Sequence, residues 1–173
     1  PALRQVCLAL KRWARCRNVY GQVRGYPSGL AFVCMAVFVA QCVSPPLCAA
    51  IDPDTVPPFA EPLVGALPHL PELEADLAPR LLSTVFQFYA DQFDWRHEVV
   101  SVRRGRRGWR AAPSAVLSVE DPVERGLDLA EPYMDAGRSA GLAAEFRRGH
   151  RLAREGRWDE LLAPRDGSFL EKK

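Results

Sequence analysis

Apolar residues near the start of the chain recur at the spacing of an α-helix. Basic side chains occupy most of the positions between them, so one side of the expected helix is apolar and the other is positively charged. The pattern therefore predicts an amphipathic helix over residues 2–17. Its apolar positions are Leu3, Val6, Cys7, Leu10, Trp13 and Ala14, and its basic positions are Arg4, Lys11, Arg12, Arg15 and Arg17.

A second helix is indicated by the apolar run from Gly29 to Val43. Because almost every residue in this run is apolar, the helix is expected to be buried in the core. The run is shorter than the roughly 20 residues needed to cross a bilayer, so no membrane span is expected. Residues 18–29, which are rich in glycine, predict a loop, and Ser28 is well placed to cap the helix that follows.

Proline is dense between Ser44 and Pro79, which predicts a long loop without extended regular structure. A third helix is predicted over residues 80–93. We therefore expect residues 1–43 to form the first two core helices, residues 44–79 a proline-rich loop, and residues 80–173 the remainder of the same single domain. The prolines of this loop are Pro45, Pro46, Pro53, Pro57, Pro58, Pro62, Pro68, Pro71 and Pro79.

The periodicity changes after the third helix. Residues 99–102 and 115–119 are predicted to be two short strands, joined by a basic loop. Residues 135–155 predict a last long helix, and residues 157–162 a short helical turn. The expected fold class is mainly α: a helical bundle with a small two-stranded β element and one long proline-rich loop.

Composition changes this picture only in detail. The chain has 173 residues, enough for one domain with a substantial core. Its formal net charge is +2, so any affinity for nucleic acid would depend on local clusters of arginine. The cysteines are odd in number (five) and include no CxxC pair, which predicts buried free thiols in a reducing compartment. Because the chain begins with Pro1 rather than methionine, we expect a processed or truncated product.

Four stretches resemble, in order and spacing, motifs of one known family. Residues 8–15 read L-A-L-K-R-W-A-R, and residues 25–31 read G-Y-P-S-G-L-A. Residues 86–95 read F-Q-F-Y-A-D-Q-F-D-W, with V-V-S-V at 99–102 and E-D-P-V-E at 120–124. These motifs are similar to those of the template-independent RNA nucleotidyltransferases, namely the terminal uridylyltransferases and non-canonical poly(A) polymerases. The resemblance implies their helical central domain with its poly(A)-polymerase-associated segment.

The resemblance implies a nucleotide-binding role for Lys11, Arg15 and Ser28. In the family, two cations four residues apart on one helix face meet the nucleotide triphosphate. Lys11 stands at the first of these positions, and Arg15 at the second, where the family has lysine. Arginine still binds phosphate, although its forked geometry differs from the point charge of lysine. The alternative for both residues is a solvated basic helix face.

Three residues depart from the family at this site. Gly29 replaces a serine that contacts the triphosphate in the family, and Leu30 replaces a tyrosine that stacks on the base. Met134 stands where the uridylyltransferases have a histidine that helps to select uracil. Together these departures suggest that the nucleotide site is vestigial.

Nucleotidyl transfer in the family also requires a separate domain with a Gly-Ser loop and three carboxylates that bind two divalent metals. The sequence contains no such combination. Asp52 and Asp54 form an isolated D-x-D within the proline-rich loop and are expected to be solvated. We therefore assign no catalytic residue, no metal ligand and no cofactor. Mg²⁺ with UTP or ATP would act only if a catalytic domain were supplied elsewhere.

The densest positive patch lies at residues 103–110. Its guanidinium groups and interleaved indole suit contacts with phosphate and stacking on an unpaired RNA base. A solvated hairpin tip and a contact with an acidic protein are the alternatives. The candidate RNA-binding residues are Arg103, Arg104, Arg106, Arg107, Trp109 and Arg110.

Three functional hypotheses follow from these residues. The leading one is a non-catalytic remnant of an RNA 3′-terminal nucleotidyltransferase (a pseudoenzyme), kept as a structural or RNA-binding subunit of a larger ribonucleoprotein or multiprotein complex. The second is the C-terminal part of an active terminal uridylyltransferase or non-canonical poly(A) polymerase. The third is a scaffold subunit that contacts only proteins. The expected partners are other protein subunits and RNA, and the first expectation for location is the mitochondrion, otherwise another reducing compartment.

Overall fold

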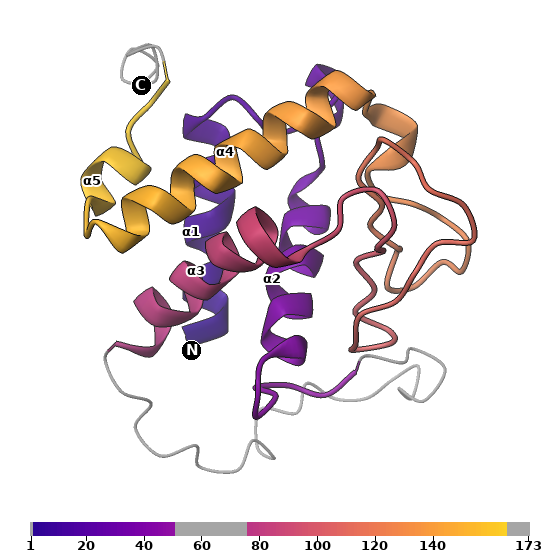
Figure 1. Cartoon of the computed structure of the whole chain (residues 1–173), viewed down its shortest axis with the longest axis horizontal. Helices are drawn as coiled ribbons and strands as arrows, with labels where there is room; N and C mark the ends of the chain where they lie inside the picture. Colours follow the sequence, from indigo (N-terminus) through magenta and orange to yellow (C-terminus); the bar gives the residue numbers. More distant parts are fainter. Residues whose placement is uncertain (1, 51–75, 166–173) are drawn as a thin grey trace.

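The computed structural model describes residues 2–50 and 76–165 of the chain. In these residues the helices are α1 (Ala2–Cys16), α2 (Gly29–Cys42), α3 (Leu77–Gln87), α4 (Ala136–Arg154) and α5 (Trp158–Leu161). Short helical turns are η1 (Gln22–Arg24), η2 (Phe88–Gln92) and η3 (Glu131–Tyr133). The predicted mainly-α class is confirmed. The irregular segment between η2 and η3 lies beside α2, on the side away from α5 (Figure 1).

The first two helices form where the apolar pattern predicts them. α1 buries Val6, Leu10 and Trp13 along one side. α2 is buried along most of its length, and the Ser28 hydroxyl caps it by accepting a hydrogen bond from the Ala31 N–H at 3.3 Å. This bond satisfies one of the backbone donors that the first turn of a helix leaves without an internal partner.

The third helix begins earlier than predicted. It starts at Leu77, so Pro79 lies within its first turn rather than at the end of the loop. Proline is tolerated there because the first N–H groups of a helix have no carbonyl partner to lose. Residues 51–75 of the predicted proline-rich loop, including Asp52 and Asp54, lie outside the described residues.

An aromatic cluster holds the four long helices together. Trp13 of α1 lies at ring-centroid distances of 6.5 Å from Phe32, 5.0 Å from Phe86 and 4.8 Å from Phe146, which belong to α2, α3 and α4. The wider turn η2 places Tyr89 against the same cluster, and the Tyr89 hydroxyl donates to the Met35 carbonyl at 3.0 Å. Because these rings come from four separate segments, the cluster fixes how α1 and α2 meet.

The predicted pair of strands is reduced, in the described residues, to isolated bridges. Val100 pairs with Val119 in parallel, and Glu98 pairs with Trp109 in antiparallel orientation. Side chains also bond backbone groups of this segment. The Asp128 carboxylate, for example, accepts from the Val119 and Ala130 N–H groups. The segment is therefore held both by backbone bonds, such as that from the Val100 N–H to the Ser118 carbonyl, and by bonds from side chain to backbone.

No helix in the described part of the chain is long and apolar enough to span a bilayer. The five cysteines, all within residues 2–50, are free thiols, but only two of them are buried as predicted. Cys16 and Cys34 are buried, and Cys7, Cys42 and Cys48 are partly buried.

Candidate functional site

Two cations stand on one face of α1, beside the start of α2. Lys11 and Arg15 are one helical turn apart, so their side chains project from the same face. Lys11 is partly buried, whereas Arg15 is exposed. A Cβ atom at position 29, the first residue of α2, would lie 3.3 Å from the Lys11 Cε. The structure therefore brings Lys11 of α1 to the N-terminal turn of α2, although the loop 17–28 separates them in sequence.

Tyr20, in that loop, completes this corner. Its ring stacks on Phe32 at a centroid distance of 5.9 Å and an interplanar angle of 10°. The Arg15 guanidinium lies 4.6 Å from the centroid of the Tyr20 ring and donates a hydrogen bond of 3.2 Å to the Tyr20 hydroxyl. A Cβ atom at Gly29 would lie only 2.5 Å from that hydroxyl oxygen, so glycine is the residue that fits there. We call Lys11, Arg15, Tyr20 and Gly29 the α1–α2 corner.

Ser28 and Leu30 flank Gly29 at the same corner. The Ser28 hydroxyl caps α2, so this predicted nucleotide-binding residue has a structural role whether or not it also meets a ligand. Leu30 is 47% exposed and presents an apolar side chain to solvent beside the corner. The N-terminal end of α2 carries the positive end of the helix dipole, which favours an anion at this position.

The loop between α1 and α2 is tied to the start of α4. Arg138 donates from Nε to the Arg24 carbonyl at 3.0 Å, and its guanidinium pairs with Asp135, the N-cap residue of α4. Hydrogen bonding from the Arg138 N–H, with the Arg138 charge as a smaller cause, holds the pKa of the Asp135 carboxyl below its usual value. Met134 is 8% exposed and packs in the hydrophobic core. Arg138 thus positions the loop that carries Tyr20. The sequence pattern did not predict this role of Arg138.

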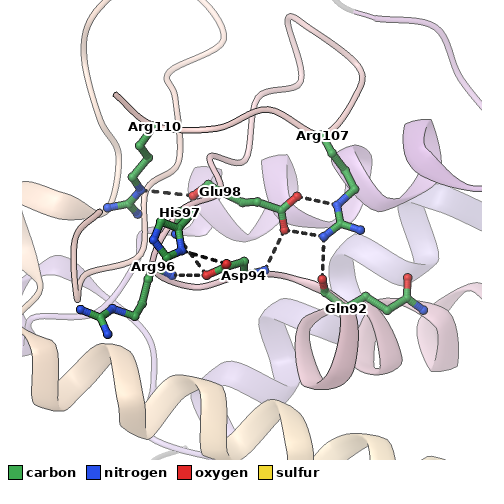
Figure 2. A network of polar contacts seen from close by, with 7 residues as sticks. All are labelled: Gln92, Asp94, Arg96, His97, Glu98, Arg107 and Arg110. Atoms are coloured by element: carbon green, nitrogen blue, oxygen red, sulfur yellow. Dashed lines mark hydrogen bonds and ion pairs between the residues drawn. The ribbon is translucent and has the colours of Figure 1, made fainter. Parts of the chain in front are cut away.

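The structure gives two members of the predicted RNA-binding patch a structural role. Arg107 donates to both carboxylate oxygens of Glu98 and to the Gln92 carbonyl (Figure 2). Arg110 donates to the Glu98 carbonyl at 3.2 Å (Figure 2). It also donates to the Val116 carbonyl. These two arginines therefore hold the irregular segment together from within.

Arg104, Arg106 and Trp109 are exposed, as Arg107 is, and Arg103 is partly buried. Trp109 is 65% exposed, with its ring 6.5 Å from that of His97. Arg103 donates to the Val123 carbonyl at 3.2 Å, and the Arg104 guanidinium lies 3.9 Å from the Glu120 carboxylate.

A cavity of about 320 Å³ opens beside two of the predicted arginines. It is lined by three arginines and one glutamate, namely Arg103, Arg104, Arg125 and Glu120. Arg125 was not among the residues that the sequence singled out. Its position directly after the E-D-P-V-E stretch is the signal that could have drawn attention to it. The cavity has the charge and the donors to accept a phosphate group.

No metal centre accompanies these sites. Within residues 2–50 and 76–165, no three His, Cys, Asp or Glu side chains gather closely enough to hold a metal ion. The residues present do not fit a divalent metal, so we assign it no step in this part of the molecule.

Comparisons with known proteins agree with the motifs. Residues 80–126 match the model of the Cid1 family poly A polymerase. The chain is 30% identical to the poly(A) RNA polymerase cid11 of Schizosaccharomyces pombe, over 94% of this chain and 36% of that protein. It is 27% identical to the poly(A) RNA polymerase GLD2 of Bos taurus, over 70% of this chain and 28% of that protein.

Solved structures share the fold. The structure of mtPAP in complex with UTP superposes with a TM-score of 0.73 and 18% identity, over 95% of this chain and 40% of that one. The MgGTP-bound Cid1 poly(U) polymerase superposes with a TM-score of 0.74 and 22% identity, over 94% of this chain and 55% of that one. The chain thus spans well under two thirds of each relative. It corresponds to one region of the proteins that form the family of non-canonical poly(A) polymerases and terminal uridylyltransferases.

Proposed function

We propose that this region binds the triphosphate of the incoming nucleotide in an enzyme that adds nucleotides to RNA 3′ ends. The observation that carries the proposal is the α1–α2 corner, where the Lys11 side chain approaches the first residue of α2 and Arg15 donates to the adjacent Tyr20 hydroxyl. A triphosphate carries several negative charges, and two cations on one rigid helix can offset them with little reordering. The names of cid11 and GLD2 describe poly(A) RNA polymerases, which is the same class of reaction.

The chemistry of transfer lies outside the described residues in this proposal. The metal-binding carboxylates would come from a catalytic domain in the same polypeptide or in another chain. Lys11 and Arg15 would bind and orient the triphosphate, and they would not activate the attacking hydroxyl. Orientation alone is a large part of phosphoryl-transfer catalysis, because the reaction depends on in-line geometry and charge stabilisation.

The test is nucleotide binding by the 173-residue chain, measured by calorimetry with UTP and ATP. The variant K11A/R15A should bind at least tenfold more weakly than the wild type. The matched control is R4A/R12A, which removes the same charge from the same helix at exposed positions, and it should bind within about threefold of the wild type. Equal losses in the two variants would mean that only net charge matters, and the proposal would then be wrong.

A second candidate function is an RNA-binding or structural subunit without catalysis. It is favoured by the arginine-lined cavity of Arg103, Arg104 and Arg125, and by the departures at Leu30 and Met134. In this hypothesis the cavity binds a phosphate group of an RNA strand, and further protein subunits cover the rest of the molecule. A protein-only scaffold is the remaining alternative.

RNA affinity, measured as a function of salt, tests the second candidate. R104A/R125A should weaken binding of a single-stranded RNA and make its salt dependence shallower, because fewer counterions are released. R151A/R154A, on the exposed side of α4, is the control of equal charge. Arg107 is left intact because it holds Glu98. Unchanged RNA affinity would favour the protein scaffold, and incorporation of labelled UTP or ATP by the chain alone would exclude a non-catalytic remnant.

A further inference from the structure

Tyr20 and Gly29 fit each other as a pair. A Cβ atom at position 29 would lie 2.5 Å from the Tyr20 hydroxyl oxygen and 3.5 Å from the Tyr20 Cζ. The first distance is far inside van der Waals contact, so any larger residue at position 29 would displace the tyrosine. The phenol of Tyr20 therefore fills the space into which a side chain at position 29 would project.

The Tyr20 hydroxyl is also directed to the cationic part of the corner. The Lys11 Cε lies 3.3 Å from the same Cβ point at position 29. The hydroxyl and the end of the Lys11 side chain thus approach one point from two different segments. An anion held by Lys11 at the start of α2 would lie within reach of the phenol.

The hydrogen bonding of the phenol leaves its proton available. Arg15 donates to the Tyr20 oxygen at 3.2 Å, which uses one acceptor site of the hydroxyl. The O–H proton can then be donated to a second group, and a phosphate oxygen only accepts. The ring itself is held in place by stacking on Phe32 and by the Arg15 guanidinium above it. The hydroxyl is therefore positioned before a ligand arrives, which lowers the entropic cost of binding.

We propose that the Tyr20 hydroxyl donates a hydrogen bond to a phosphate oxygen of the bound nucleotide, next to Lys11. The absence of a side chain at Gly29 leaves the space that the Tyr20 phenol occupies. The inference rests on the proposed function of the same corner. It names a residue that neither the motifs nor the comparisons single out, and it explains the glycine as one half of a matched pair. The hydroxyl donor of the triphosphate site then comes from Tyr20 in the loop, and not from α2, where the family has a serine at the position of Gly29.

The experiment measures affinity of the 173-residue chain for inorganic tripolyphosphate and for UTP. Tyr20→Phe keeps the stacked ring and removes only the hydroxyl, and it should weaken binding of both probes by five- to tenfold. Tyr26→Phe, in the same loop, is the control and should change neither affinity by more than about twofold. A loss confined to UTP would place the hydroxyl at the nucleoside and would overturn the proposal.

A reciprocal pair of substitutions tests the fit independently. Gly29→Ser alone should weaken tripolyphosphate binding, because the new side chain displaces the phenol. Tyr20→Ala alone should also weaken it, and the double variant Y20A/G29S should bind more tightly than either single variant. Additive losses in the double variant would overturn the matched pair, as would wild-type affinity in Tyr20→Phe.

Binding by the wild type and by K11A/R15A distinguishes a failure of the proposed function from a failure of the role of Tyr20. If the wild-type chain bound neither tripolyphosphate nor UTP, the proposed function and the role of Tyr20 would fall together. If the wild type bound both, and K11A/R15A did not, a normal affinity in Tyr20→Phe would overturn the role of Tyr20 alone. Circular dichroism of each variant distinguishes a lost contact from a lost fold.

Discussion

The side chain of Glu98 is fully buried, and its two carboxylate oxygens contact the guanidinium of Arg107 at 2.5 Å and 2.7 Å. The carboxylate also accepts the Asp94 N–H at 2.7 Å. Arg107 by contrast is 45% exposed. The buried Glu98 charge is therefore compensated by an exposed arginine, and the loss of stability should differ according to which of the two residues is replaced.

Arg107→Ala should lower the free energy of unfolding by about 3 kcal/mol, because it leaves the Glu98 charge buried without its cation. Glu98→Gln should cost about 1 kcal/mol, because the amide removes the buried charge while Arg107 can reach solvent. Urea denaturation measures both. Arg106→Ala, which truncates the exposed neighbour of the same type, should change stability by less than about 0.5 kcal/mol. An equal loss in R106A and R107A would contradict the structural role of Arg107.

Gly149→Ala should destabilise the contact between α3 and α4. A Cβ atom at Gly149 would lie 2.5 Å from two carbons of the Phe86 ring, and that ring is fully buried in the aromatic cluster. The clash should outweigh the better helix propensity of alanine and cost about 1–3 kcal/mol. Gly141→Ala, in the same helix, meets only the Tyr26 hydroxyl at 3.8 Å and should stabilise the chain by about 0.5–1 kcal/mol. Thermal unfolding of the two variants should therefore shift in opposite directions.

Arg138→Ala should loosen the loop between α1 and α2 without unfolding the core. The substitution removes the hydrogen bond to the Arg24 carbonyl and the pairing with Asp135. Hydrogen exchange of the amides in residues 21–26 should become faster, and UTP affinity should fall by a few fold because Tyr20 is held less firmly. Arg147→Ala, at an exposed position of the same helix, should leave both measurements unchanged. Unaltered exchange in R138A would show that the loop does not depend on this anchor.

Cys34 should make the chain less stable at alkaline pH. Burial, and secondarily the charge of Asp121, raises the pKa of its thiol from 9.0 to about 12. Between these values the unfolded chain loses the proton while the folded chain keeps it. Stability from this group is therefore complete below about pH 9 and falls as the pH rises towards 12, by at most about 1.4 kcal/mol per pH unit.

The comparison is between the wild type and Cys34→Ala. Urea denaturation is measured at several pH values from 8 to 11, the range set by this shift. The free energy of unfolding should fall less steeply with pH in the variant, by a slope that corresponds to at most one bound proton. The absolute loss of stability from the smaller side chain is the same at every pH, so only the difference in slope matters. Parallel curves would mean that Cys34 does not titrate differently in the folded chain.

The residues that resemble the family motifs led to the correct family and fold class. The helical periodicity also located α1, α2 and α4 to within a few residues, because an amphipathic or wholly apolar pattern depends on local spacing alone. The expected strands were less accurate. The segment forms only isolated bridges, and side chains also bond its backbone, as Asp128 does at the Val119 N–H and Arg110 at the Val116 carbonyl.

The sequence by itself therefore determined the helices, the cap at Ser28, the two cations on α1 and the likeness to the nucleotidyltransferases. Only the tertiary structure decided that Arg107 and Arg110 hydrogen-bond within the irregular segment, that Arg125 joins a cavity with Arg103, and that Tyr20 occupies the space beside Gly29. The physical reason is that periodicity reports which side of an element is buried. The partner that a side chain meets is fixed instead by how separate elements pack together.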